Sequence, residues 1–130
     1  MRKIGLLDKN FAHHAINTSD FVTLYQLEIQ PFQWERNIEK CAFDVDIDTI
    51  VFTDECLHEV FRFGNINKRK IAWLIEPKSI NSFPYEYIFR NYEKFSLIVS
   101  HDIKFLSSIP NGRYCPVSCT WIQPEDWGVK

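Results

Sequence analysis

The clearest structural signal in the chain is the sequence KRKIAWLIEPKSI at residues 68–80. A basic cluster opens this segment, the apolar run at residues 71–75 follows, and Glu76 and Pro77 end it. A short apolar run with polar residues on both sides is typical of a buried strand in a parallel sheet. Pro77 has no backbone N–H to donate to a neighbouring strand, so pairing should end there. Glu76 is therefore expected at the carboxyl end of a buried strand, where open α/β sheets gather their functional groups.

Apolar runs of the same kind lie on both sides of this segment, at residues 3–8, 49–52, 95–99 and 113–118. Helical patterns separate them. In one of these, Leu57, Val60 and Phe61 should share a face, and Gly64 should end the helix. Strands that alternate with short helices indicate βαβ units, whose right-handed crossovers place helices on both faces of a mainly parallel sheet. We therefore expect an α/β fold, a Rossmann-like three-layer sandwich with about five or six strands.

Composition narrows the class of protein. The 130 residues are 45% hydrophobic, which is enough for one domain with its own core. Fifteen Lys and Arg stand against 17 Asp and Glu, and this net charge of −2 gives no electrostatic case for binding nucleic acid or an anionic membrane. No apolar segment approaches the ~18 residues of a membrane helix, and the four cysteines fall at no zinc spacing. We expect a cytoplasmic domain with reduced thiols and no membrane segment.

Four of the predicted strands end on ionisable residues, namely Asp8, Asp54, Glu76 and the pair His101 and Asp102. The carboxyl ends of parallel strands share one edge of the sheet, so these groups should converge on one crevice. Asp54 and Asp102 each precede a predicted helix, and capping that helix is an alternative role for both. His101 would act as a general acid or donate a hydrogen bond to a ligand, or else be satisfied locally at the strand end.

Glu76 differs from the other acids because a proline, and not a helix start, follows it. Burial at the mouth of an apolar strand would disfavour the ionised carboxylate and make Glu76 a stronger base. This combination favours a catalytic or ligand-binding role. Tyr85, on the next predicted helix, is expected in the core or at its rim. The four glycines are scattered and form no phosphate-binding loop.

Three of these segments resemble the amino-terminal domain of viral and environmental glycosyltransferases, which are themselves similar to the α-1,3-fucosyltransferases of glycosyltransferase family ten. The family pattern begins with a basic residue and a hydrophobic strand that ends in an acid, matched here by residues 70–76. A second strand with its acid matches residues 95–102, and an arginine-tyrosine-proline strand matches RYCP at residues 113–116. The resemblance covers residues 68–122 and departs from the family at Pro77, where the family usually has asparagine.

This resemblance implies that residues 1–130 form one Rossmann-like half of a two-domain, GT-B-type inverting glycosyltransferase. Glu76 would be the general base that deprotonates the acceptor hydroxyl. The candidate substrate-binding residues are His101, Asp102, Asp54, Asp8 and Tyr85. A nucleotide-sugar donor, GDP-fucose in the fucosyltransferase-like case, would bind a second α/β domain of the same protein. This chain would hold the carbohydrate acceptor, with no cofactor and no metal, and would be inactive alone.

Two alternatives outside the transferases stay open. Asp8 and Asp54, after the first and third strands, are placed as in the receiver domains of two-component signalling, where clustered acids hold Mg²⁺. Receivers also need Ser or Thr after the fourth strand and Lys after the fifth, whereas here these strands end in Glu76 and in a serine-histidine pair. The second alternative is a non-catalytic α/β binding domain. Tyr85 or His101 close to Glu76 would favour sugar transfer.

Overall fold

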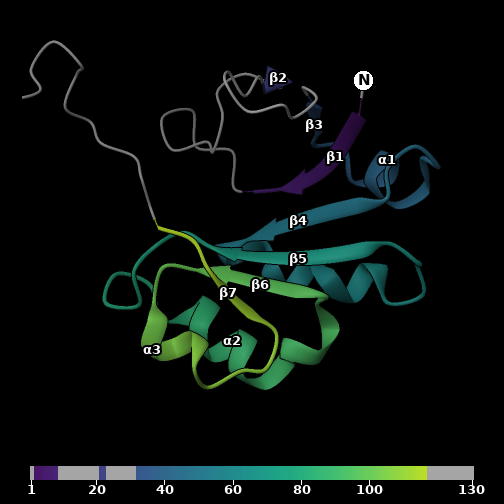
Figure 1. Ribbon diagram of the computed structural model, residues 1–130. Coiled ribbons are helices and arrows are strands. Elements are labelled where there is room, and N and C mark those ends of the chain that lie inside the picture. Colours follow the sequence, from purple (N-terminus) through teal and green to yellow (C-terminus); the bar gives the residue numbers. More distant parts are fainter. Residues whose placement is uncertain (1, 9–20, 23–31, 117–130) are drawn as a thin grey trace, which may run out of the picture.

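The computed structural model describes residues 2–8, 21–22 and 32–116, and within them a seven-stranded sheet forms the centre of the molecule (Figure 1). The strands are β1 (Arg2–Leu7), β2 (Phe21–Val22), β3 (Phe32–Glu35), β4 (Thr49–Thr53), β5 (Arg69–Leu74), β6 (Leu97–Ser100) and β7 (Gly112–Tyr114). Their order across the sheet is β2-β3-β1-β4-β5-β6-β7. Neighbouring strands run parallel except β2, which is antiparallel to β3. The predicted α/β, Rossmann-like fold is confirmed.

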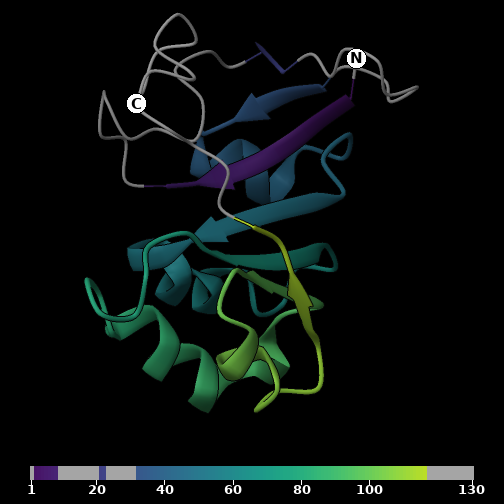
Figure 2. The same cartoon turned by 60° about the vertical axis from the view of Figure 1, so that its left-hand side comes forward.

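The amino-terminal strand β1 lies inside the sheet, between β3 and β4 (Figure 2, purple). The chain therefore moves outward from β1 to β3, returns past β1 to β4, and then adds β5, β6 and β7 in order. This reversal of direction is the topological switch point of a doubly wound sheet, and such sheets bind ligands at the carboxyl ends of their strands.

Five short helices accompany the described strands. They are α1 (Ile38–Phe43), the 3-10 helix η1 (Asp54–Phe63), α2 (Phe83–Asn91), the 3-10 turn η2 (Tyr92–Lys94) and α3 (Ile103–Leu106). Within the described ranges, none of them has the length and apolar character that crossing a bilayer would demand.

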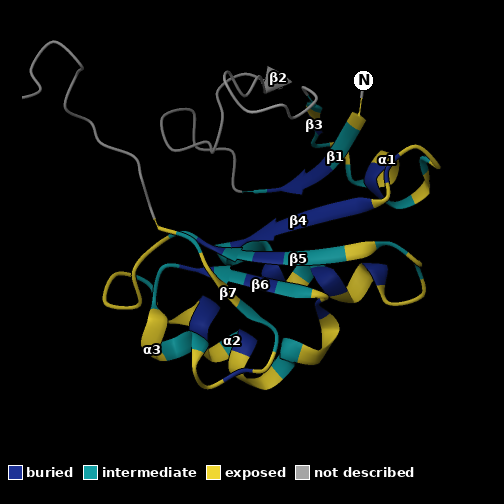
Figure 3. Cartoon of the chain, in the orientation of Figure 1, coloured by how far each residue is buried: buried dark blue, intermediate teal, exposed yellow. Residues whose placement is uncertain are grey.

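The main hydrophobic core lies between the helices and one face of the sheet. Strand β4 runs through its middle, and every residue of β4 is buried (Figure 3). Phe52 of β4 contacts Phe63 of η1 edge to face, with ring centroids 5.5 Å apart. Ile88 of α2 is buried in the same core, and the partly buried Phe105 of α3 packs against it. Helix α1 contributes the buried Cys41 to this core. The four longest of the described helices, α1, η1, α2 and α3, thus all pack against the same face of the sheet.

Successive residues of a strand point to opposite faces, so a second cluster forms behind the sheet. Leu6, Trp34 and Val51 are its buried members. The described helices pack against the first face, and the prediction of helices on the second face is left untested by the described residues.

The segment after β4 is helical, as predicted, but its buried face differs from the prediction. Leu57, Val60 and Phe63 are buried, whereas 61% of Phe61 is exposed. The buried residues recur at every third position, which is the period of a 3-10 helix. The predicted grouping of Phe61 with Leu57 and Val60 assumed an α-helical period and is wrong. Gly64 ends the helix, as predicted.

Strand β1 and helix α1 approach each other closely at Gly5. A Cβ atom added there would lie 2.9 Å from Sγ of Cys41 and 3.2 Å from Cγ1 of Ile50. Cys41 is fully buried, and its thiol donates a hydrogen bond to the Glu35 carbonyl at 3.1 Å. Burial is the main cause that raises the pKa of this thiol to about 11. Cys41 is therefore a protonated core residue, and its thiol fits beside β1 because Gly5 has no side chain.

Replacing Gly5 with alanine is expected to lower the free energy of unfolding by about 1–3 kcal/mol, because the added methyl group forces α1 away from β1. Urea denaturation followed by circular dichroism measures the change. The matched control is Gly64→Ala, whose added Cβ would meet the Phe61 carbonyl oxygen at an ordinary 3.5 Å on a right-handed helical backbone. Equal stability of the Gly5→Ala variant and the wild type would contradict the close contact.

Candidate functional site

The candidate site lies at the carboxyl edge of the sheet, where β4, β5 and β6 end next to one another. Asp54 follows β4, Glu76 comes shortly after β5, and His101 and Asp102 follow β6. The structure therefore brings these four predicted residues to one edge. Their surroundings differ, and each side chain makes a different set of contacts.

Asp54 connects the ends of two strands. Its Oδ1 accepts a hydrogen bond from the backbone N–H of Ile75 at 2.9 Å, so the carboxylate continues the pairing between β4 and β5 beyond the last strand residue. To do so, Asp54 adopts a φ of 31°, a left-handed conformation that aspartate tolerates better than most residues. The alternative of helix capping is therefore wrong for Asp54.

The carboxylate of Asp54 is costly to ionise. Burial is the largest cause that raises its pKa from 3.8 to about 6, and the nearby negative charge of Glu76 adds to this rise. The backbone N–H groups of Ile75 and Glu76, together with His101, act in the opposite direction. Because all of these groups act on one carboxylate, Asp54 lies at the centre of the strand-end cluster.

Glu76 is exposed, and in this respect the sequence prediction is wrong. The burial expected at the mouth of β5 falls on Asp54 instead, because the chain turns outward after Ile75. The backbone of Glu76 is nevertheless held firmly, since its carbonyl accepts a hydrogen bond from the Tyr85 hydroxyl at 2.7 Å. We call the Asp54 carboxylate and the Tyr85 hydroxyl the strand-end clamp, because they hold the backbone at Ile75 and Glu76 from two directions.

Tyr85 belongs to the core, as predicted, with 1% of its surface exposed, and its hydroxyl reaches the strand ends. Burial is the main cause that raises the pKa of Tyr85, and the carboxylates of Asp102 and Asp54 raise it further, whereas a hydrogen bond with the Ser100 side chain lowers it. Tyr85 is therefore a neutral hydrogen-bond donor that links α2 to the ends of β5 and β6.

Asp102 caps the short helix after β6. Its Oδ1 accepts from the backbone N–H of Phe105 at 2.9 Å, which confirms the capping alternative for this residue. The Asp102 backbone N–H donates in turn to Oγ of the fully buried Ser100 at 3.1 Å. Between them, His101 keeps a buried Nδ1 that has no hydrogen-bond partner among the described residues. An unsatisfied ring nitrogen at a strand end is suited to a ligand.

Asp8 has a different partner from the rest of the cluster. Its Oδ1 accepts a long hydrogen bond of 3.4 Å from Nε of Arg36, which follows β3, and its side chain is 7% exposed. In the described part of the chain, no group of three His, Cys, Asp or Glu side chains could hold a metal ion. Within the described ranges, Asp8 pairs with Arg36 and Asp54 with the Ile75 amide, so these two acids do not share a partner.

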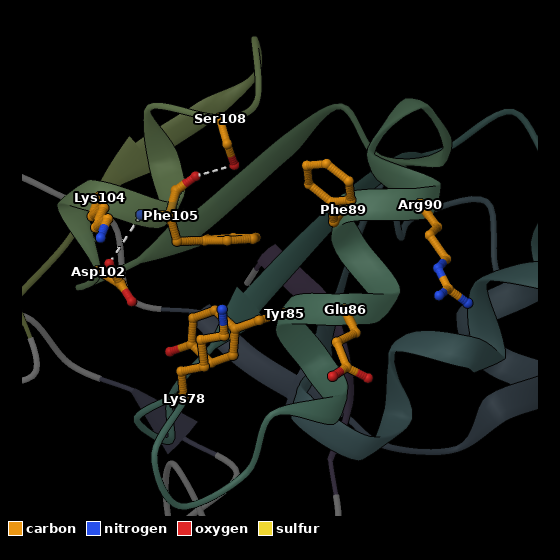
Figure 4. A pocket seen from close by; sticks show the side chains of 9 residues that line it. All are labelled: Lys78, Tyr85, Glu86, Phe89, Arg90, Asp102, Lys104, Phe105 and Ser108. Carbon is orange, nitrogen blue, oxygen red and sulfur yellow. Dashed lines mark hydrogen bonds between the residues drawn. The ribbon is translucent and has the colours of Figure 1, made fainter.

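A groove adjoins the strand ends on the side of α2 and α3 and has a volume of about 550 Å³ (Figure 4). Its lining consists of Lys78, Tyr85, Glu86, Phe89, Arg90, Asp102, Lys104, Phe105 and Ser108. Tyr85 and Asp102 belong both to the groove and to the strand-end cluster. Sequence reasoning found these two and missed the other seven, because charged and aromatic residues on short exposed helices carry no distinguishing pattern.

Comparisons with protein-family models, with curated proteins and with solved structures found no match to this chain. The functional roles of Glu76, His101, Asp102, Asp54, Asp8 and Tyr85 therefore stay predictions, now with a geometry on which they can be tested.

Asp54→Asn is expected to raise the free energy of unfolding at pH 7.5 by about 1–2 kcal/mol, because it removes a desolvated charge and keeps an acceptor for Ile75, while solvent screens part of the penalty. The pKa of Asp54 is higher in the folded than in the unfolded state, so the folded protein binds the proton more tightly. Its penalty is complete above about pH 6 and is relieved as the pH falls towards 3.8.

Urea denaturation at several values between pH 4 and pH 7.5 measures this effect as the difference between variant and wild type. The advantage of Asp54→Asn should shrink towards the acidic end. Glu93→Gln, which replaces an exposed acid, is the control and should show a difference that does not vary with pH. A constant difference for Asp54→Asn across the same range would show that Asp54 carries no desolvation penalty.

Proposed function

We propose that this chain is the acceptor-side domain of an inverting glycosyltransferase, which transfers a sugar from a nucleotide-sugar to a carbohydrate acceptor. One observation carries the proposal. Glu76 presents its side chain to solvent at the carboxyl end of β5, on a backbone that the strand-end clamp holds. A general base must meet the substrate hydroxyl at a fixed position, so an accessible carboxylate on an immobilised backbone suits this task. The resemblance at residues 70–76 and 95–102 points to the same residue.

In the proposed reaction, the Glu76 carboxylate removes the proton from the acceptor hydroxyl while that oxygen attacks the anomeric carbon of the donor sugar. The bond from this carbon to the nucleoside diphosphate breaks as the new bond forms, so the configuration inverts. The donor, GDP-fucose in the fucosyltransferase-like case, would bind a second α/β domain of the same protein in the cytoplasm. The isolated chain would therefore bind the acceptor without turning it over.

The other residues of the edge would serve the acceptor and the base. Asp54 and Tyr85 would set the position of Glu76 through the clamp. His101, which is partly exposed, would offer its ring to a hydroxyl group of the acceptor. Asp102 would contribute the carboxylate oxygen that does not cap α3. Asp8, which pairs with Arg36, would lie at the margin of the site.

Glu76→Gln in the full-length protein with its donor domain is expected to lower kcat by about 10²–10⁴-fold, because the amide cannot accept the hydroxyl proton. The Michaelis constant for the acceptor should change much less, since Gln keeps the size and hydrogen-bonding capacity of the side chain. Initial rates over a range of acceptor concentrations separate the two effects.

The matched control is Glu93→Gln, an exposed acid on the 3-10 turn after α2, which should keep wild-type kcat. Thermal unfolding checks that both variants are folded. Wild-type turnover by Glu76→Gln would exclude Glu76 as the base. If Asp54→Asn lost turnover while Glu76→Gln kept it, Asp54 and not Glu76 would be the base.

A further inference from the structure

The groove between α2 and α3 has the dimensions of a ligand site, and its position links it to the strand ends. Its volume of about 550 Å³ lies in the usual range for small-molecule pockets. Lys78, two residues beyond Glu76, forms one part of the wall, and Tyr85 of the strand-end clamp forms another. Glu76 itself does not line the groove, which therefore adjoins the proposed base without including it.

Aromatic side chains line the groove. The rings of Tyr85 and Phe105 meet edge to face with centroids 4.9 Å apart, and this contact fixes the junction of α2 and α3. Phe89 is 60% exposed and turns an apolar ring towards the ligand space (Figure 4). Aromatic faces of this kind suit the apolar C–H surfaces of a sugar ring, whose edges carry the polar groups.

Three cationic and two acidic side chains line the groove. The groove therefore has a net positive charge, whereas the whole chain has a net charge of −2. Lys78, Arg90 and Lys104 are exposed, and the charged group of none of them forms an ion pair or hydrogen bond with another described residue. Of the acids, Asp102 already accepts a hydrogen bond at the start of α3. Glu86 lies exposed in the first turn of α2.

The charges are also unevenly placed. Figure 4 shows Lys78 and Lys104 at the end of the groove near Tyr85 and Asp102, whereas Arg90 lies at the other end, beyond Glu86. The end of the groove near the strand edge thus carries two positively charged lysines and one carboxylate, that of Asp102, which already caps α3. An anionic group would be stabilised there, and the same group next to Glu86 would be repelled.

We propose that this groove binds an acidic saccharide, with its carboxylate, sulfate or phosphate group between Lys78 and Lys104 and its sugar ring against Phe89 and Phe105. This inference rests on the proposed function, because it names the chemical class of the acceptor. The anionic group at the lysine end orients the sugar so that a hydroxyl can approach Glu76.

The test is a titration of the 130-residue chain with two disaccharides that differ in one group, cellobiose and its glucuronic-acid analogue cellobiouronic acid. Isothermal titration calorimetry at 150 mM NaCl and pH 7 should show binding of the acidic sugar that is about 5–10-fold tighter. Lys78→Gln and Lys104→Gln should each remove most of this preference and leave the affinity for cellobiose unchanged. Phe89→Ala should weaken the binding of both sugars.

Lys40→Gln on α1, an exposed lysine outside the groove, is the matched control and should keep the preference. Equal affinity for the two sugars would overturn the acidic-saccharide inference while leaving the proposed acceptor role intact. Binding of neither sugar would overturn both. Loss of the preference in Lys40→Gln as well, or sulfate alone binding as tightly as the acidic sugar, would also overturn the inference. Cellobiose 6-sulfate and 6-phosphate, titrated in parallel, identify which anionic group fits best.

Discussion

The parallel register between β4 and β5 sets the positions of Asp54 and Glu76 in the candidate site. Thr53 lies opposite Trp73, so both strands end at the same level and the next residues of each chain face one another. The hydrogen bond from the Ile75 amide to the Asp54 carboxylate then replaces the backbone partner that β4 no longer provides. Without this bond a partly buried amide would be left unsatisfied, and only the Tyr85 hydroxyl would hold the backbone at Glu76.

The same arrangement is unfavourable for stability at neutral pH. Asp54 is buried enough to raise its pKa to about 6, and it has a positive φ. A side chain that is both desolvated and conformationally restricted costs free energy, which the packing of the fully buried β4 offsets. Such local costs collect at functional sites, and here they coincide with the strand ends at which the sequence predicts function.

The fold was predictable because hydrophobic runs and their polar ends recur along the chain. The apolar run at residues 71–75 and the acid after it identify β5 and its carboxyl end without reference to any other segment. The division of labour between Asp54 and Glu76 was not predictable. It depends on a positive φ at Asp54 and on the outward turn after Ile75, and neither leaves a residue pattern. The predicted helical face of Leu57, Val60 and Phe61 fails for a similar reason, since the sequence does not distinguish a 3-10 from an α-helical period there. The groove depends on how α2 meets α3, which only tertiary packing determines.

The position of β1 inside the sheet has a consequence for folding. Strands β4 to β7 pair in chain order, whereas β1 lies between β3 and β4 and pairs with β4 across a longer stretch of chain, with Gly5 opposite Ile50. Loop-closure entropy therefore favours assembly of β4 to β7 first, with β1 and β3 added later, an order that amide exchange during refolding would reveal. The edge that carries Asp54, Glu76 and His101 belongs entirely to the part that forms first. The side chains of the proposed site would then be in place before β1 has joined the sheet.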